Sequence, residues 1–537
     1  MRKGPLAQSY PAAVALVVCS LIPFLALTAA ALPVLPQVGK ALHLSSATLD
    51  VAVAMSTAAY AVGTVFAVQF AVRLPARRML IVYELLFVAA SLLVSTTSNG
   101  GVFVGAFIVQ GLCTSLLLIA AVPPLVTAWP PKKMPMTGGI MNLCIFGAVA
   151  VGPTIGAAAA AAASWHLLFW GVAGVAVLAL IFSVLTYEDV PPADTTAPVD
   201  IGALGLALVG CGAAFYGAGA LQAFGLLDVE QLLPLCGGFA LVVALVVYQY
   251  KRKEPLMPVR AFATTVPVVG ITIALFASAA GFGLMELVLT ALETSSTPGN
   301  TALLFLPEFV GAAVVAGLFG AFFRTKYVTV LAFSGLVCIA AAAAVFLEWA
   351  TSGSVVVAVG TGLLGLGVGA SVSPALFMAG FSLKASQLQR VFALIELLRG
   401  VTAFLVAPIL LYLVTHVWGT TATGIDAAIG ICLGLSVTGL VVAYGLHVFG
   451  KVGFETPDID RWQEEGEPAW SSPPLLAHLR RSTPPGAARH PAAAGAAGLR
   501  RPGVPEAKNR VANHHGERDH QARMAGRRAV GGGGGGR

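Results

Sequence analysis

Residues 48–97 are, in succession, TLDVAVAMSTAAYAVGTVFAVQFAV, RLPARR and MLIVYELLFVAASLLVSTT. Two apolar runs, of 25 and 19 residues, flank a six-residue turn that carries Arg73, Arg77 and Arg78. A helix needs about 20 apolar residues to cross the hydrocarbon core of a bilayer, so each run is long enough to span it. The stretch therefore predicts two membrane-spanning helices joined by a short basic turn.

The same alternation of apolar run and short gap extends over most of the chain. Of its 537 residues, 57% are hydrophobic and 10% are charged, whereas a soluble domain is about 25% charged. Apolar runs of spanning length occur at 11–34, 48–72, 79–97, 102–128, 137–163, 167–187, 201–222, 232–250, 264–292, 302–323, 327–347, 354–381, 389–416 and 424–449. These fourteen runs predict an all-α polytopic membrane protein.

Basic residues are confined almost entirely to alternate gaps between the runs. Of the 17 Lys and Arg residues before residue 450, 15 lie in the N-terminal segment or in the gaps 73–78, 132–133, 251–260, 324–326 and 384–390. Loops rich in Lys and Arg stay in the cytoplasm. We therefore expect a multi-pass protein of the cell membrane with both termini in the cytoplasm.

The net charge of +7 does not indicate a nucleic-acid partner, because residues after 450 carry 14 basic and 9 acidic side chains and supply most of it. That segment has no apolar periodicity, and we expect residues 451–537 to be a disordered cytoplasmic tail. Seven cysteines lie in apolar runs without a metal-ligand spacing, and no phosphate-binding Gly-Lys loop is present. The sequence thus predicts no metal site, no cofactor and no enzymatic site.

Several short motifs occur in an order and spacing found in one transporter family. They are Ala31-Leu32-Pro33, Gln110-Gly111, the group Gly139, Gly152, Pro153 and Gly156, Ser164-Trp165 with Phe169-Trp170, Asp200-Ile201-Gly202, and the segment 254–262. Over residues 10–449 the sequence resembles the major facilitator superfamily, specifically its fourteen-span drug:proton antiporter branch. The resemblance implies two six-helix halves that rock around a midplane cavity, with Gly139, Gly152, Pro153 and Gly156 as the antiporter motif of the fifth helix.

A repeated basic turn agrees with a two-half organisation. Such a turn follows the second run, at 73–78, and the tenth run, at 324–326. Internal repeats are usual in secondary transporters, and the two turns occupy equivalent places if runs 1–6 and 9–14 are the halves. We expect an N-terminal half over residues 1–187, two inserted helices over 188–260 and a C-terminal half over 261–450.

Three positions depart from the family pattern. The turn 72–78 lacks the usual Asp, Phe107 stands where an Arg is usual, and Phe24 stands where an acidic residue is common. The resemblance implies that these groups carry much of the gating and proton coupling in relatives. The charges that do lie within apolar runs are therefore the candidates for coupling.

Glu286 and Glu308 lie at similar depth in consecutive runs, each about seven residues from the gap 293–301, or roughly 10 Å at the helical rise per residue. An ionised carboxylate there is costly, which favours its neutral form, and two facing carboxyls would titrate as a pair. We expect proton coupling or substrate binding at these residues. The alternative is that they only form hydrogen bonds in a polar crevice.

Glu396 and Arg399 lie one turn apart on one face of the thirteenth run. They predict an internal ion pair, or a cavity-lining pair that opens when a substrate or a proton arrives. Gln110 and Asn142 lie within the fourth and fifth runs. Hydrogen bonds between helices are the default for such residues, and cavity lining is the alternative.

Glu84 lies five residues into the third run, close in sequence to Arg77 and Arg78. We expect Glu84 either to extend toward the membrane surface or to form a salt bridge with these arginines, in a cytoplasmic gate that also includes Arg73. Asp50 follows Ser45, Ser46 and Thr48 and is interpreted as a stabilising charge at a helix N-terminus.

These features together predict a monomeric secondary active transporter in the lipid bilayer, with a small-molecule substrate and protons as its partners. The resemblance favours proton-coupled efflux of lipophilic or cationic small molecules, such as drugs and antibiotics, by alternating access. A facilitator or uptake permease of the same fold without proton antiport is the first alternative, favoured by the three departures. A membrane-embedded enzyme or a sensor would need a polar cluster at one membrane face or a folded soluble domain, and the sequence shows neither.

Overall fold

The computed structural model describes residues 5–186, 196–224, 228–348, 353–418 and 422–475. These residues form fourteen helices long and apolar enough to cross a membrane, so the predicted number of spans is confirmed. In the first part of the chain the long helices are α1 (Tyr10–Ala30), α3 (Ser46–Arg73), α4 (Ala76–Thr96), α5 (Gly100–Thr127), α6 (Met134–Asn142) continued by η3 (Leu143–Gly147) and α7 (Ala148–Ala161), and α8 (Trp165–Thr186). The remaining ones are α9 (Ile201–Phe224), α10 (Val229–Lys251), α11 (Thr265–Ser295), α12 (Pro298–Phe322), α13 (Tyr327–Leu347), α15 (Ser354–Phe381), α16 (Leu388–Tyr412) continued by η6 (Leu413–Val417), and α17 (Ala422–Phe449).

Short polar residues begin several of these helices, because their side chains satisfy backbone N–H groups that have no partner within the helix. Ser45 Oγ accepts a hydrogen bond from the Thr48 N–H at the start of α3. Asn99 Oδ1 accepts hydrogen bonds from the N–H groups of Gly101 and Val102 at the start of α5. The gaps between apolar runs therefore coincide with helix starts at which a nearby polar side chain caps the backbone.

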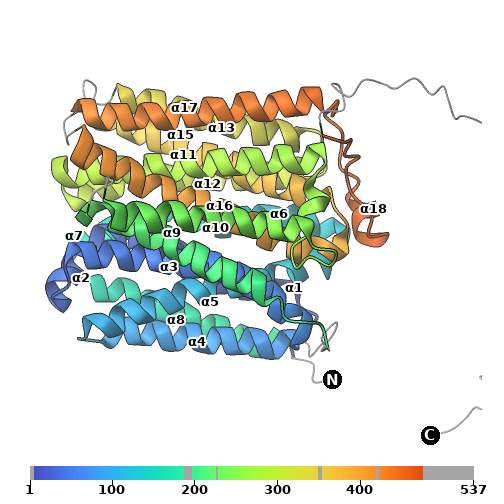
Figure 1. The fold of residues 1–537 in the computed structure, drawn as a ribbon, viewed down its shortest axis with the longest axis horizontal. Helices are drawn as coiled ribbons and strands as arrows, with labels where there is room; N and C mark the ends of the chain where they lie inside the picture. Colours follow the sequence, from blue (N-terminus) through green and yellow to red (C-terminus); the bar gives the residue numbers. More distant parts are fainter. Residues whose placement is uncertain (1–4, 187–195, 225–227, 349–352, 419–421, 476–537) are drawn as a thin grey trace, which may run out of the picture. The chain divides into compact units, whose positions relative to one another are not determined.

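The inserted helices α9 and α10 are drawn in green near the middle of the bundle in Figure 1. We call α1 and α3–α8 the N-terminal half and α11–α13 and α15–α17 the C-terminal half, after the division expected from the sequence. Helix α9 packs mainly against α3 and α10, and it also contacts α16 of the C-terminal half. We call the end of the bundle that carries the basic turns the basic face, and the other end, where the short helix α2 (Leu35–Leu42) lies, the opposite face.

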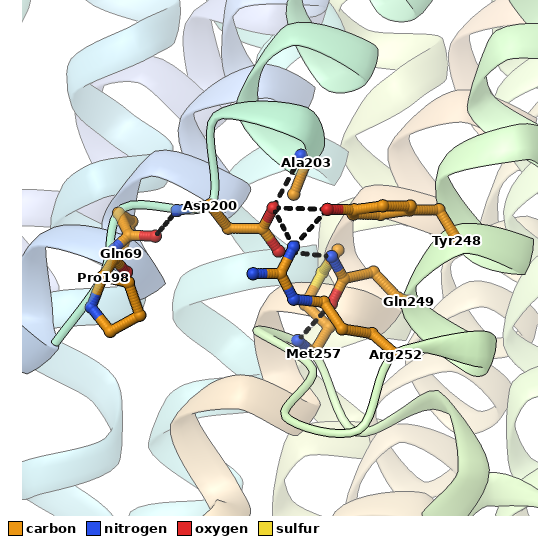
Figure 2. Close-up of polar contacts among 8 residues, drawn as sticks. All are labelled: Gln69, Pro198, Asp200, Ala203, Tyr248, Gln249, Arg252 and Met257. Atoms are coloured by element: carbon orange, nitrogen blue, oxygen red, sulfur yellow. Dashed lines mark hydrogen bonds and ion pairs between the residues drawn. The ribbon is translucent and has the colours of Figure 1, made fainter.

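A buried polar cluster fixes the basic-face end of the inserted pair (Figure 2). The Asp200 carboxylate accepts hydrogen bonds from Tyr248 Oη at 3.1 Å and Gln249 Nε2 at 3.0 Å, both in α10. It also forms an ion pair with Arg252 Nη1 at 2.9 Å. Gln69 of α3 accepts a hydrogen bond from the Asp200 backbone N–H at 3.0 Å. The cluster therefore ties α9 to both α10 and the N-terminal half.

The first part of the C-terminal segment is folded, contrary to the expectation of disorder from residue 451. Helix α18 (Ile459–Glu464) places the Trp462 side chain at 0% exposure against Phe381, with the ring centroids 4.3 Å apart. Trp462 Nε1 donates a hydrogen bond to the Leu383 carbonyl at 2.9 Å, and the Thr265 N–H donates one to the Pro473 carbonyl at 3.0 Å. The buried side chains of Trp462, Trp470 and Ile459 and these hydrogen bonds hold a segment that has no apolar periodicity. We call residues 456–475 the strap; residues 476–537 lie outside the described part of the chain.

Candidate functional site

The two halves enclose connected cavities that open toward the opposite face. A vestibule of about 530 Å³ has Lys40, His43 and Glu293 at its exposed rim. It continues into a central cavity of about 90 Å³, and the side chains of Asp50 and Glu286 line both spaces. Helices α1, α3, α9, α11 and α16 all contribute to the wall of the central cavity. A solute in this cavity would therefore touch both halves.

Two smaller cavities adjoin the central one. Arg399 lines a cavity of about 10 Å³, and Glu308 lines another of about 10 Å³, each with room for about one water molecule. The Phe282 ring lines the central cavity and both smaller ones, so it stands where the three spaces meet. Its centroid lies 5.2 Å from that of Phe404 in α16, which places an aromatic pair at this junction. Glu286, Glu308 and Arg399, three of the four charged residues predicted for coupling, therefore line neighbouring cavities that share the Phe282 side chain.

Asp50 and Glu286 come from different halves and share one cavity. Asp50 lies one turn inside α3, and Glu286 lies in α11. Both side chains are half-buried, and neither forms an ion pair within the described ranges. Ser45 caps α3, and the Asp50 carboxyl, one turn further along the helix, lines the cavity. The interpretation of Asp50 as a helix-terminus charge missed this placement.

Glu286 and Glu308 line different cavities, so the condition for a coupled pair, that the two carboxyls face each other, is not met in this structure. The side chains of Phe282 and Met285 line both cavities and lie between the two carboxyls. Glu308 is 4% exposed, and its Oε2 atom has no hydrogen-bond partner among the described residues. The two glutamates have similar depth, but their helices pack mainly against other helices, α11 against α15, α16 and α17 and α12 against α15 and α7. Their side chains therefore point into neighbouring spaces.

Glu396 and Arg399 form the predicted ion pair. Arg399 Nη2 lies 2.6 Å from Glu396 Oε2, and the two side chains are only 3% and 4% exposed, respectively. Tyr60 Oη of α3 donates a hydrogen bond to the same carboxylate oxygen at 3.0 Å. The Arg399 guanidinium also lies 5.8 Å from the centroid of the Phe146 ring. An ion pair on the C-terminal half is thus held by two aromatic residues of the N-terminal half.

The glycines of the antiporter motif bring backbones into contact. A Cβ atom on Gly139 would lie 2.8 Å from the Ala316 carbonyl oxygen of α12, in the other half. A Cβ atom on Gly152 would lie 2.6 Å from the Ala26 carbonyl oxygen, and one on Gly156 would overlap the Ala30 carbonyl oxygen, both in α1. Pro153 is buried between these two glycines in α7. The motif therefore packs the fifth span against α1 on one side and against the C-terminal half on the other.

Glu84 has a different partner from the one expected. Its carboxylate is fully buried and accepts a hydrogen bond from Ser20 Oγ of α1 at 2.5 Å. No ion pair joins it to an arginine within the part of the chain that the structure describes. Arg77 instead donates a hydrogen bond to the Val184 carbonyl at 3.2 Å. Arg73 and Arg78 lie at the same turn on the basic face, so the three arginines remain together without Glu84.

Gln110 and Asn142 form hydrogen bonds between helices, as the default interpretation predicts. Gln110 Nε2 donates to Ser91 Oγ of α4 at 2.9 Å. Asn142 Nδ2 donates to the Gly369 carbonyl of α15 at 3.2 Å. The second bond joins the two halves, as does a bond from Gln389 Nε2 of α16 to the Ile119 carbonyl of α5 at 3.0 Å. These contacts hold the halves together away from the vestibule.

Comparison with known proteins identifies this arrangement. Residues 16–400 match the Major Facilitator Superfamily. The chain belongs to this superfamily. Major facilitator proteins are secondary transporters that move small-molecule substrates across a membrane, and the fourteen spans and connected cavities agree with that activity.

Curated relatives agree with the family. The lincomycin resistance protein LmrB of Bacillus subtilis (strain 168) is 30% identical over 170 residues, which are 31% of this chain and 35% of LmrB. The MFS-type transporter YcnB of the same organism is 26% identical over 251 residues, which are 46% of this chain and 52% of YcnB. The chain thus spans about half or less of the length of these relatives.

Solved structures show the same fold. A peptide transporter POT superposes with a TM-score of 0.58 at 16% identity, covering 82% of this chain and 95% of that one. The human organic anion transporter MFSD10 (TETRAN) superposes with a TM-score of 0.54 at 13% identity, covering 82% of this chain and 100% of that one. At these identities the likeness is one of fold alone.

Proposed function

We propose that this major facilitator transporter exports lipophilic or cationic small molecules, drugs and antibiotics among them, in exchange for protons. The observation that carries the proposal is the shared placement of Asp50 and Glu286 in the central cavity, without an ion-pair partner among the described residues. Negative charge in a largely apolar wall is neutralised either by a proton or by a cation that enters the cavity. A cavity that can hold either a proton or a cation, but not both at once, would exchange one for the other across the membrane.

The direction of export rests on the charge pattern and the open end of the cavities. The positive-inside pattern makes the basic face cytoplasmic. The vestibule then opens outward, while the Gln389–Ile119 contact and the strap close the cytoplasmic side. In this state protons from outside reach Glu286, and in the alternate state a cytoplasmic solute reaches the same cavity. The distant likeness to the lincomycin resistance protein LmrB supports an exported antibiotic as one substrate.

Glu308 is the second proposed coupling group. Its cavity adjoins the central one through Phe282 and Met285, so a rearrangement of these two side chains would join the two carboxyls. In this proposal Glu308 holds the proton while the cavity is occupied. The Glu396–Arg399 pair lines the third cavity and supports the wall that both halves share.

The test is substrate-induced proton movement in vesicles that contain the purified chain. We expect Glu286→Gln and Glu308→Gln each to abolish proton release on addition of a lipophilic cation, because an amide cannot exchange a proton for the cation. Glu230→Gln, which makes the same change at an exposed position at the start of α10, is the matched control and should leave proton release intact. Normal proton release from the Glu286→Gln, Glu308→Gln double variant would contradict the proposal.

A facilitator without proton antiport is the second candidate, and one observation favours it. Phe24 and Phe107, at the two positions where relatives carry charge, pack against each other with centroids 6.4 Å apart. An aromatic contact there leaves nothing to titrate in the N-terminal half at that position. In the same vesicles, a facilitator would move substrate down its gradient with no proton movement in any variant.

A further inference from the structure

The inserted helix α9 forms part of the wall of the central cavity. Ala218, Gly219 and Gln222 line this cavity together with Asp50 and Glu286. Helix α9 also packs against α3 of the N-terminal half and α16 of the C-terminal half. A solute beside Asp50 and Glu286 would also contact the inner face of α9. The inserted helix is therefore part of the cavity wall and not only an addition at the edge of a twelve-helix bundle.

Contacts at two levels along the axis of α9 fix its position beside the cavity. At the basic face, the Asp200 cluster ties the start of the helix to Gln69 of α3 (Figure 2). Near the cavity, a Cβ atom on Gly219 would lie 2.7 Å from the Ala54 Cβ and 3.1 Å from the Asp50 carbonyl oxygen. The backbone of α9 is therefore in close contact with the turn of α3 that carries Asp50. The side chain one turn further along α9, Gln222, is held at a defined place in the wall.

The Gln222 amide is satisfied at one end only. Its Oε1 atom accepts a hydrogen bond from Thr415 Oγ1 of the C-terminal half at 2.9 Å. This contact orients the amide. Its Nε2 atom is buried and has no hydrogen-bond partner among the described residues. A buried amide donor without an acceptor is rare in folded proteins, because its desolvation is not compensated. Gln222 lines the cavity while its Nε2 atom is covered in this structure, so the missing acceptor points to a solute atom that Nε2 meets when the neighbouring side chains of the wall move.

We propose that Gln222 is a substrate-binding residue that donates a hydrogen bond from Nε2 to an oxygen acceptor on the transported molecule. The substrate class is then a lipophilic cation that also carries a carbonyl, ether or hydroxyl oxygen. Its positive charge lies against Asp50 or Glu286, and its oxygen lies against α9. This proposal rests on the proposed function, since it needs the central cavity to hold the solute. The proposal adds that the inserted helix α9 favours cations that carry an oxygen acceptor over cations that do not.

The test compares two cations that differ in whether they have an acceptor. Tetraphenylphosphonium has none, and rhodamine 6G carries an ester carbonyl. Gln222→Met keeps the length of the side chain and removes the amide. We expect it to lower kcat/KM for rhodamine 6G about three- to ten-fold, the range of one neutral hydrogen bond, and to leave tetraphenylphosphonium transport unchanged. Val209→Met, on the exposed side of the same helix, is the matched control and should change neither rate.

Each other outcome overturns the assignment. An equal loss for both cations in Gln222→Met means that the residue only supports the fold of the wall. Unchanged rates for both mean that the amide does not contact the solute. If the unmodified chain moves neither cation, the proposed function itself fails, which is distinct from a normal transporter in which Gln222→Met has no selective effect.

Discussion

Neutralising Glu396 tests how strongly the central ion pair depends on its burial. Glu396→Gln leaves the Arg399 guanidinium charged at 3% exposure, with Tyr60 and the Phe146 ring as its remaining neighbours. Removing one partner of a buried pair costs about 3–5 kcal/mol, because the remaining charge is desolvated without compensation. We therefore expect the free energy of unfolding to fall by about that amount. Replacing both residues, as in Glu396→Met with Arg399→Met, should recover most of the loss, since no isolated charge is left.

The measurement is unfolding in mixed micelles with increasing sodium dodecyl sulfate. Cys113, Cys211 and Cys432 are fully buried and free, so their labelling by a thiol-reactive dye reports opening of the bundle. Glu467→Gln is the control, because Glu467 pairs with Lys384 at 3.4 Å on the surface, and an exposed pair is worth about 0–1 kcal/mol. If Glu396→Gln costs no more than Glu467→Gln, the pair is not desolvated in the membrane and the reasoning fails.

Two further predictions concern packing. Gly156→Ala should separate α7 from α1 and destabilise the chain by about 1–3 kcal/mol, whereas Gly174→Ala, where a Cβ meets nothing within 4 Å, should be neutral or stabilising in the same unfolding assay. Equal effects of the two changes would show that the close contact is not present. Trp462→Ala removes the buried ring of the strap, a change of about 3–5 kcal/mol in a packed core, so we expect residues 456–475 to become cleavable by an added protease. Removal of residues 481–537 should leave the strap protected, and equal protection of the strap in Trp462→Ala would contradict its anchoring role.

The number of spans could be predicted from the sequence because hydropathy reports the solvent around each helix, and that solvent is lipid. The orientation of side chains around each helix could not be predicted in the same way. Glu286 and Glu308 have the depth that the sequence indicates, but depth does not set rotation, and a helix turns about 100° per residue. Tertiary packing against other helices sends the two carboxyls into different cavities.

Residues missed by sequence reasoning lack a local signal. Tyr60 and Gln222 are single polar side chains within long helices, and only the fold brings them to Glu396 and to the central cavity. Asp50 had a plausible local role at a helix start, which concealed its tertiary one. The strap depends in part on Trp462, an aromatic residue in a segment without periodicity, and an anchor of this kind is recognisable only from the groove that receives it.

The contact between α6 and α12 has a consequence for how such a transporter diversifies. Gly139 faces the Ala316 carbonyl oxygen, and a Cβ on Gly320 would lie 3.0 Å from the Pro135 carbonyl oxygen, so the two halves meet here through main-chain atoms. Main-chain atoms are the same whatever residues line the cavities. Substitutions at Phe282, Met285 or Gln222 can therefore change which molecules fit without altering this seam. The lining of the cavities and the packing of this seam therefore depend on different atoms of the chain.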